Sequence, residues 1–126
     1  MNKKEAVLDL LRPIEKEHFK FVMNLDGCLA SSGNCRKAIV LWSLLRPSFE
    51  ESSLNRQFPN PLMFVEEALE TLLFHSQDAF TVTIGDWQGT TKDFRDSDLR
   101  LLDLAEAHAE GRFLVTRKEE SCETDE

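Results

Sequence analysis

Candidate nucleophiles and bases are scattered along the chain, and no motif joins them. Cys28 opens a stretch of small residues, and Leu-Ala-Ser-Ser follows it where a catalytic thiol would need a nucleophile turn. His75 lies three residues before Asp78, so an imidazole and a carboxylate could be combined with that thiol. A small enzyme that uses Cys28, or the His75 and Asp78 pair, is therefore one alternative. Because no local signature supports it, we predict no catalytic residue and no enzymatic activity.

Two groups of acids have the residue type, but not the full pattern, of a metal site. Glu66 and Glu70 lie one helical turn apart, whereas a di-iron site also needs Glu-x-x-His pairs on facing helices. The acids of segment 93–98 lack the glycine and the distal glutamate of a calcium loop. The glycines of segment 85–89 lack the spacing and the basic residue of a phosphate loop. We therefore predict no metal and no cofactor, and we interpret residues 66–70 as a solvated helix face.

Trp87 is the side chain best suited to contact a partner. A tryptophan next to a turn either folds back onto the sheet or stays partly exposed, and exposed tryptophans are enriched at binding hot spots. Both alternatives stay open. If Trp87 is exposed, the outward face of a helix over 61–76 and the segment 86–98 form one acidic protein-binding surface. The predicted protein-binding residues are Glu66, Glu67, Glu70, Asp86, Trp87, Asp93, Asp96 and Asp98.

The net charge of −8 is unevenly distributed along the chain. Residues 1–46 carry eight Lys and Arg against five Asp and Glu, whereas residues 47–126 carry seven against eighteen. An acidic surface disfavours nucleic acid as a direct ligand and suits a protein partner with a basic surface. Solubility is the alternative explanation, because the last ten residues hold five of the acids.

These patterns predict a small acidic protein-binding regulator or inhibitor, of the phage-inhibitor, antitoxin or immunity type. It would occupy a basic surface of a nucleic-acid-handling partner. An assembly or secretion chaperone is a further alternative. No apolar region follows the N-terminal lysines and no apolar run is long enough to span a bilayer, so we expect no membrane association and a cytoplasmic location. The cysteines at 28, 35 and 122 are odd in number, and we expect free thiols in a reducing compartment.

The elements that must position these residues are organised around a predicted central helix, about residues 35–46. Seven of the eight residues from Ala38 to Leu45 are apolar, so this helix must be covered on several sides. We expect Trp42 and Leu45 to be fully buried, and Leu45→Ala to lower the free energy of unfolding by about 2–5 kcal/mol. Pro47 is expected to end the helix.

Two further helices and one ambiguous segment are predicted on either side of the central helix. Residues 2–11 form the first helix, with Asn2 as its N-cap. Residues 18–25 fit either a helix or a strand. Asn60 and Pro61 begin a helix that runs to about residue 76. The apolar residues expected on its buried face are Leu62, Val65, Leu69, Leu72 and Leu73.

The C-terminal part of the chain has the spacing of a small sheet with one more helix. Alternation at 79–84 predicts a strand, and Gly85-Asp86 predicts a turn into a second strand at 87–91. Asp96-Ser97 is expected to cap a helix that ends at Gly111. A third strand is predicted at 112–116.

The predicted fold class is α+β and mostly helical. Four to five helices pack around the central helix, with a two- to three-stranded antiparallel sheet. Residues 1–116 are expected to form a single globular domain, and residues 117–126 a disordered acidic tail.

Overall fold

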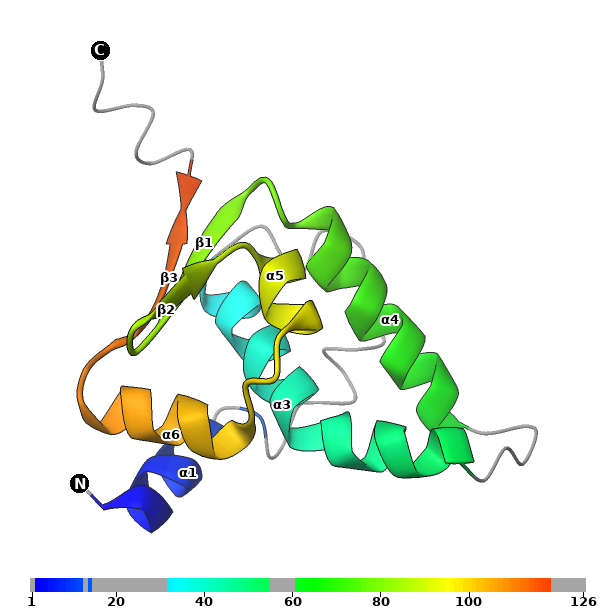
Figure 1. Ribbon diagram of the computed structural model, residues 1–126, viewed down its shortest axis with the longest axis horizontal. Helices are drawn as coiled ribbons and strands as arrows, with labels where there is room; N and C mark the ends of the chain where they lie inside the picture. The colour runs from blue at the N-terminus through cyan, green and yellow to red at the C-terminus, as the bar shows by residue number, and fades with distance from the viewer. Residues whose placement is uncertain (1, 13, 15–31, 55–60, 119–126) are drawn as a thin grey trace.

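The computed structural model describes residues 2–12, 14, 32–54 and 61–118 (Figure 1). Within these residues the chain forms five helices and one three-stranded antiparallel sheet. This arrangement confirms the α+β, mostly helical class. The predictions for 18–25, Cys28, Asn60 and the tail beyond 118 lie outside the described residues.

Helix α1, Lys3–Leu11, begins as its sequence predicts. The Asn2 side chain accepts a hydrogen bond of 2.8 Å from the Glu5 backbone N–H. This bond satisfies one of the free N–H groups of the first turn. Ala6 and Leu10 are buried, and the helix packs against α6, Leu101–Ala109.

Helix α3, Ser32–Leu54, is the central element, and it contacts α4, α5, α6 and β3. Its central position is confirmed, but the predicted end at Pro47 is wrong because the helix continues for another two turns. A proline inside a helix removes one N–H and bends the axis, and Figure 1 shows α3 changing direction along its length. Phe49 is buried beyond the proline, so apolar packing favours continuing the helix there.

The expected burial of two residues on α3 is half right. Trp42 is only 6% exposed, whereas Leu45 is only partly buried against the core. The buried run extends from Ala38 to Ser43 and stops before the bend. We therefore expect a smaller loss for Leu45→Ala than full burial would give, because truncating a partly exposed leucine leaves a smaller cavity.

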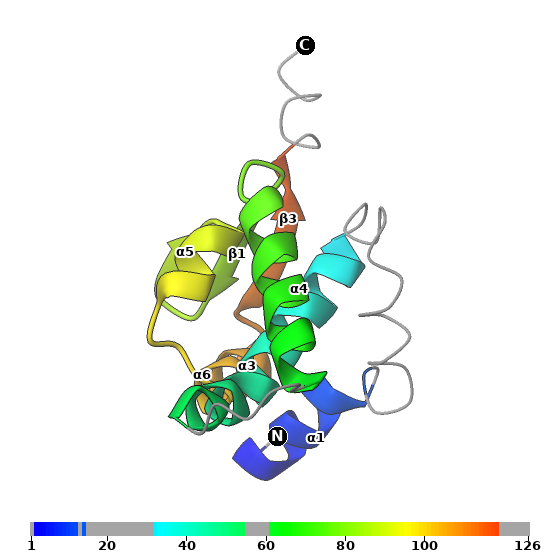
Figure 2. The ribbon, with the colours of Figure 1, turned by 90° about the vertical axis from the view of Figure 1, so that its right-hand side faces the viewer.

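Helix α4, Pro61–His75, starts at the predicted proline. Leu69 and Leu73 are fully buried, and Val65 and Leu72 pack against the core, as predicted. The side chain of Leu62 is not among those described. In Figure 2 α4 lies across α3, with which it makes extensive contacts.

The sheet has the order β2-β1-β3, with β1 at Phe80–Ile84 in the centre. Gly85 has φ of 63° in the two-residue turn to β2, Trp87–Gly89, a conformation that favours glycine. Strand β2 is two residues shorter than predicted, because the chain enters the next helix. Strand β3, Phe113–Arg117, pairs antiparallel with β1 and includes the first residue of the predicted tail.

Sequence analysis missed helix α5, Thr91–Asp96. Its start is fixed by a capping box, in which the Thr90 hydroxyl accepts from the Asp93 N–H and the Asp93 carboxylate accepts from the Thr90 N–H. The predicted cap at Asp96-Ser97 is therefore wrong: Asp96 ends α5, and α6 begins only after Arg100.

Helix α6 ends as predicted at Gly111, which has φ of 70°. The Gly111 N–H donates to the His108 carbonyl, and the Arg112 N–H donates to the Ala107 carbonyl. This pair of bonds is the Schellman arrangement, and it turns the chain into β3. Across the described residues, no helix is both long enough and apolar enough to cross a membrane.

Candidate functional site

The Trp87 side chain is half-buried on the hairpin, and its contacts fix its position. Its ring packs edge-on against Phe94 of α5, with 6.4 Å between the ring centroids. At position 89 a Cβ atom would lie 2.9 Å from the Asp93 Cβ and 3.0 Å from an atom of the Trp87 ring. Gly89 therefore gives the indole room to lie against α5, and any larger residue would displace it.

The other side of Trp87 borders an open pocket between the hairpin turn and α6. The pocket has a volume of about 290 Å³. Its lining residues are Ile84, Gly85, Asp86, Trp87, Leu99, Asp103, Glu106, Ala107, Glu110 and Arg112. We call this feature the Trp87 pocket. Trp87 was expected either to fold back onto the sheet or to stay partly exposed. Both hold in part, because the indole covers part of the core and also borders solvent.

Acidic side chains dominate the polar lining of the Trp87 pocket, with four carboxylates and one guanidinium. Asp103, Glu106 and Glu110 are spaced by three and four residues and so share one face of α6. The guanidinium of Arg112 donates a hydrogen bond of 2.6 Å to Asp86, whose side chain is almost fully exposed. The remaining acids leave the pocket with a net negative charge.

The three α6 acids differ in how they are paired. The Asp103 carboxylate accepts a hydrogen bond of 2.8 Å from the Arg100 N–H through one oxygen. Glu106 lies 3.7 Å from the Lys3 ammonium, with both side chains exposed, and such a pair is weak in water. Glu110 makes no ion pair within 4.0 Å with any described residue, although its charge acts on the nearby Arg112 guanidinium and contributes to raising the pKa of Arg112. The pocket therefore has carboxylate oxygens that other groups leave free.

The acids predicted on segment 93–98 have mostly local roles. Asp93 belongs to the α5 capping box, and the Thr90 backbone hydrogen bond lowers the pKa of its carboxyl. Asp96 pairs with Arg95 at 3.1 Å and with Lys92 at 3.5 Å, and the Arg95 hydrogen bond lowers its pKa. Asp98 is exposed and follows α5.

The predicted carboxylates on α4 do not all face solvent. Glu67 is exposed, whereas Glu66 and Glu70 are half-buried. Glu66 lies three residues before the buried Leu69, so it shares part of the packed face. Burial, with a smaller effect from the neighbouring Glu70, raises the pKa of the Glu66 carboxyl.

Exposed apolar residues accompany these acids on the outer side of α4. Phe64 is 67% exposed, Met63 44% and Phe74 40%. Residues 63, 67, 70 and 74 follow a helical stripe, so Met63 and Phe74 flank the acids. The Phe74 ring also lies 5.8 Å from the Arg95 guanidinium of α5. We call this mixed apolar and acidic face the α4 stripe.

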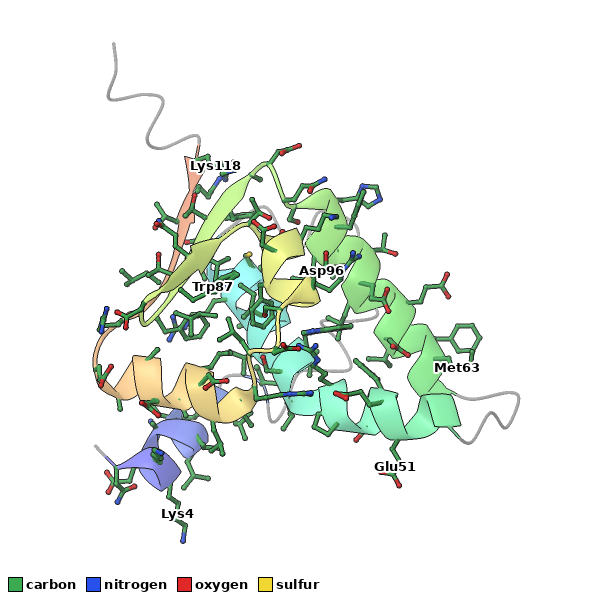
Figure 3. All side chains as sticks on the ribbon, viewed as in Figure 1. Lys4, Glu51, Met63, Trp87, Asp96 and Lys118 are labelled. Atoms are coloured by element: carbon green, nitrogen blue, oxygen red, sulfur yellow. The ribbon has the colours of Figure 1, made fainter. Side chains whose placement is uncertain are left out.

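The structure divides the predicted surface into two parts. Helix α5 lies between the hairpin and α4, and it contacts both (Figure 3). Trp87 and Asp86 lie on the side of α6, whereas Glu66, Glu67 and Glu70 lie on the far side of α5. The eight predicted residues therefore do not form one surface: Asp86 and Trp87 line the Trp87 pocket, Glu67 and Glu70 lie on the α4 stripe, Glu66 is half-buried, and the three aspartates lie on α5 or just after it. Their role in binding stays a prediction.

A second polar cluster joins three helices on the opposite side of α6 from the pocket. The Arg36 side chain of α3 reaches the His108 Nδ1 at 2.9 Å and donates to the Phe113 carbonyl at 2.8 Å. The His108 Nε2 lies 2.6 Å from the Asp9 carboxylate. The Arg36 guanidinium also lies over the Phe113 ring, 3.9 Å from its centroid.

This geometry assigns the protonation of His108. A guanidinium can only donate, so Nδ1 must accept, and Nε2 carries the proton that it donates to Asp9. The hydrogen bond from His108 is the largest influence on Asp9 and lowers the pKa of its carboxyl. Because both ring nitrogens of His108 have partners and Arg36 also donates to a backbone carbonyl, we interpret the cluster as a structural joint rather than a reactive site.

The residues of the enzyme alternative are not gathered into a site by the described part of the chain. His75 and Asp78 are exposed, and the His75 ring packs edge-on against Phe74 at 5.7 Å. Cys35 is fully buried, and burial raises the pKa of its thiol to about 12. Among the described residues, no three His, Cys, Asp or Glu side chains are close enough to hold a metal ion.

Sequence analysis missed the three acids of α6. Their spacing of three and four residues was a usable signal, because it places them on one helical face. Their position against Trp87 depends on how α6 packs against the hairpin, which no local pattern reveals. Comparisons with family models, with curated proteins and with solved structures found no match to this chain.

Proposed function

We propose that this protein is a small acidic protein-binding regulator or inhibitor, which binds a basic surface of its partner through the α4 stripe. The partner is expected to be a nucleic-acid-handling protein, and the protein itself to belong to the phage-inhibitor, antitoxin or immunity type and to act in the cytoplasm. A partner whose basic surface normally meets phosphates would be attracted by the same acidic face.

One observation carries the proposal: the exposed ring of Phe64 beside an acidic helix face. Large apolar side chains that gather on a soluble surface mark binding sites, whereas single exposed leucines need no explanation. Phe64, Met63 and Phe74 gather on one helix, and Glu67 lies among them. A helix face that served solubility alone would be polar throughout.

Acidic side chains without an ion pair also support the proposal. Glu67 and Asp98 make no ion pair with any described residue. Asp93 and Asp96 are already engaged in capping and pairing, so they have less capacity for a partner. Free charges of one sign raise the rate of encounter with a basic surface, and the apolar rings then contribute affinity by losing contact with water.

Co-purification from the native host tests the proposal. The wild type should retain a specific protein with a basic surface, and Phe64→Ser should lose it. Glu67→Lys should slow association measured by surface plasmon resonance and reduce its dependence on salt. Reversal of Asp93 is unsuitable for this purpose, because the change would also remove the α5 cap.

Leu114→Ser is the matched control, because Leu114 is 55% exposed on β3 and lies away from α4. It should leave binding unchanged. Equal loss of binding in Phe64→Ser and Leu114→Ser would point to a general effect on the fold. Unchanged binding in Phe64→Ser and Glu67→Lys, with both variants folded, would refute the α4 stripe as the binding surface.

A further inference from the structure

The Trp87 pocket has a chemistry of its own, separate from the α4 stripe. One wall is an aromatic ring whose position is fixed by Phe94 and by the glycine at 89. The opposite wall is the acidic face of α6, and Ala107 leaves space between the two. The pocket, with a volume of about 290 Å³, is therefore lined by both an aromatic ring and carboxylates.

Charge excludes most classes of ligand from this pocket. Four carboxylates against one guanidinium, which is already paired with Asp86, would repel a phosphate or another carboxylate. A metal ion needs several oxygens around one point at about 2.0–2.6 Å, and the described carboxylates are too far apart for that. What remains is an extended cation that carries several donors and has a flat or aliphatic part to lie on the indole.

An arginine side chain has these properties. Its guanidinium presents five N–H donors in a plane, bonds to carboxylates and stacks on aromatic faces. The protein already shows both interactions: Arg112, which lines the pocket itself, donates to Asp86, and Arg36 of α3 lies over the Phe113 ring. A lysine ammonium would use the carboxylates but would gain less from a flat ring.

We propose that the Trp87 pocket receives an arginine side chain from the basic partner, with Trp87 as the stacking surface and Glu106 and Glu110 as the carboxylates that receive its N–H groups. The identity of the partner as a basic protein rests on the function proposed above. Recognition of a guanidinium group, however, can be tested without the partner.

The experiment is a titration of the full chain with N-acetyl-arginine amide, followed by NMR. The Trp87 indole N–H reports on the pocket, and the buried Trp42 indole N–H is an internal reference for the fold. The Trp87 signal should shift saturably while the Trp42 signal stays in place. N-acetyl-citrulline amide, which has the same shape without the charge, should produce no saturable shift. N-acetyl-lysine amide should bind more weakly than the arginine compound.

Variants then test the carboxylates. Glu106→Gln with Glu110→Gln should weaken binding of the arginine amide at least about twofold, as expected for two exposed charge pairs. Asp103 is kept, because it caps α6. Glu67→Gln on the α4 stripe is the matched control and should leave the affinity unchanged, and an unmoved Trp42 signal shows that each variant is folded.

Three results would overturn the assignment. They are an equal response to the citrulline amide, tighter binding of the lysine amide, or an unmoved Trp87 signal with the arginine amide. Failure of the two proposals can be told apart. If partner capture depends on Phe64 while the arginine amide does not bind, only the pocket is wrong. If the arginine amide binds while Phe64→Ser captures the partner normally, only the α4 stripe is wrong.

Discussion

Helix α6 has two polar faces that differ in how many partners their side chains have. Toward α1 and α3, His108 has a partner on each ring nitrogen, and Arg36 fills the remaining space. On the side of the acids, Glu110 has no ion pair within 4.0 Å among the described residues, and Glu106 has only an exposed one, with Lys3 of α1. A charged group that already has a close partner can bind a ligand only weakly. We therefore place ligand binding on the acidic face of α6.

The difference arises from what the neighbouring elements supply. Helices α1 and α3 bring a carboxylate and a guanidinium to the His108 side. The hairpin brings an indole, and its one carboxylate is already paired with Arg112. Opposite charges therefore meet in a partly buried network on one side of α6, whereas the ion pairs on the other side, Arg112 with Asp86 and Lys3 with Glu106, are exposed. The buried apolar stripe of α6, Leu104 and Ala105, lies one helical turn before His108 and therefore on the paired side of the helix.

The first prediction tests whether this buried stripe holds α6 in the core. Leu104 is fully buried on α6, so Leu104→Ala should lower the free energy of unfolding by about 2–5 kcal/mol, measured in urea. Leu102→Ala is the control, because Leu102 is 60% exposed, and it should change stability by less than about 0.5 kcal/mol. Similar losses in both variants would contradict the placement of α6 in the core.

The second prediction compares one arginine from each face. Arg36→Ala removes the donor to His108 and to the Phe113 carbonyl, and it should cost about 1.5–3 kcal/mol, as for hydrogen bonds that involve a charged group. Arg112→Ala removes an exposed pair with Asp86 and a hydrogen bond to the Gly85 carbonyl, and it should cost clearly less, because exposed ion pairs contribute little in water. Urea unfolding of the two variants would decide; a larger loss for Arg112→Ala would reverse the assignment of the two faces.

The third prediction concerns the stability of the protein at low pH, to which the Asp9–His108 contact contributes. The pKa of Asp9 is lowered, chiefly by its hydrogen bond from His108, relative to an ordinary value of 3.8. A group whose pKa is lower in the folded state stabilises the protein above its unfolded value, and this contribution disappears as the pH falls through the folded value. Stability should therefore fall below about pH 4, and Asp9→Asn should flatten that part of the curve. A parallel curve for Asp9→Asn would contradict the contact.

Much of the fold could be predicted from local pattern. Asn2 begins α1, Pro61 begins α4, and Gly85 and Gly111 lie where a left-handed conformation is needed. These signals are local because the residue type itself sets the backbone geometry. Pro47 led to a wrong prediction of the end of α3. Its local preference for ending a helix was overridden by burial of Phe49 further along α3.

The candidate site could be predicted only in part. Trp87 was found because the residue type is informative near a turn. The acids that face it were missed, because their placement follows from strand pairing and helix packing. The cluster at His108 shows the same limit, since its partners Asp9 and Arg36 are 99 and 72 residues away in the sequence. Contacts of that range depend on the whole fold and leave no local spacing to recognise.

The last prediction has the smallest effect and sharpens the comparison most. Glu110 follows the last turn of α6, where the carbonyl end of the helix dipole disfavours a negative charge. Glu110→Gln should therefore raise the free energy of unfolding slightly, by about 0.3–1 kcal/mol, while it weakens binding of the arginine amide. Glu67→Gln, within α4 and away from both helix ends, should change neither property by a comparable amount. If Glu110→Gln instead destabilised the protein, this carboxylate would have a structural partner, and the two faces of α6 would be alike.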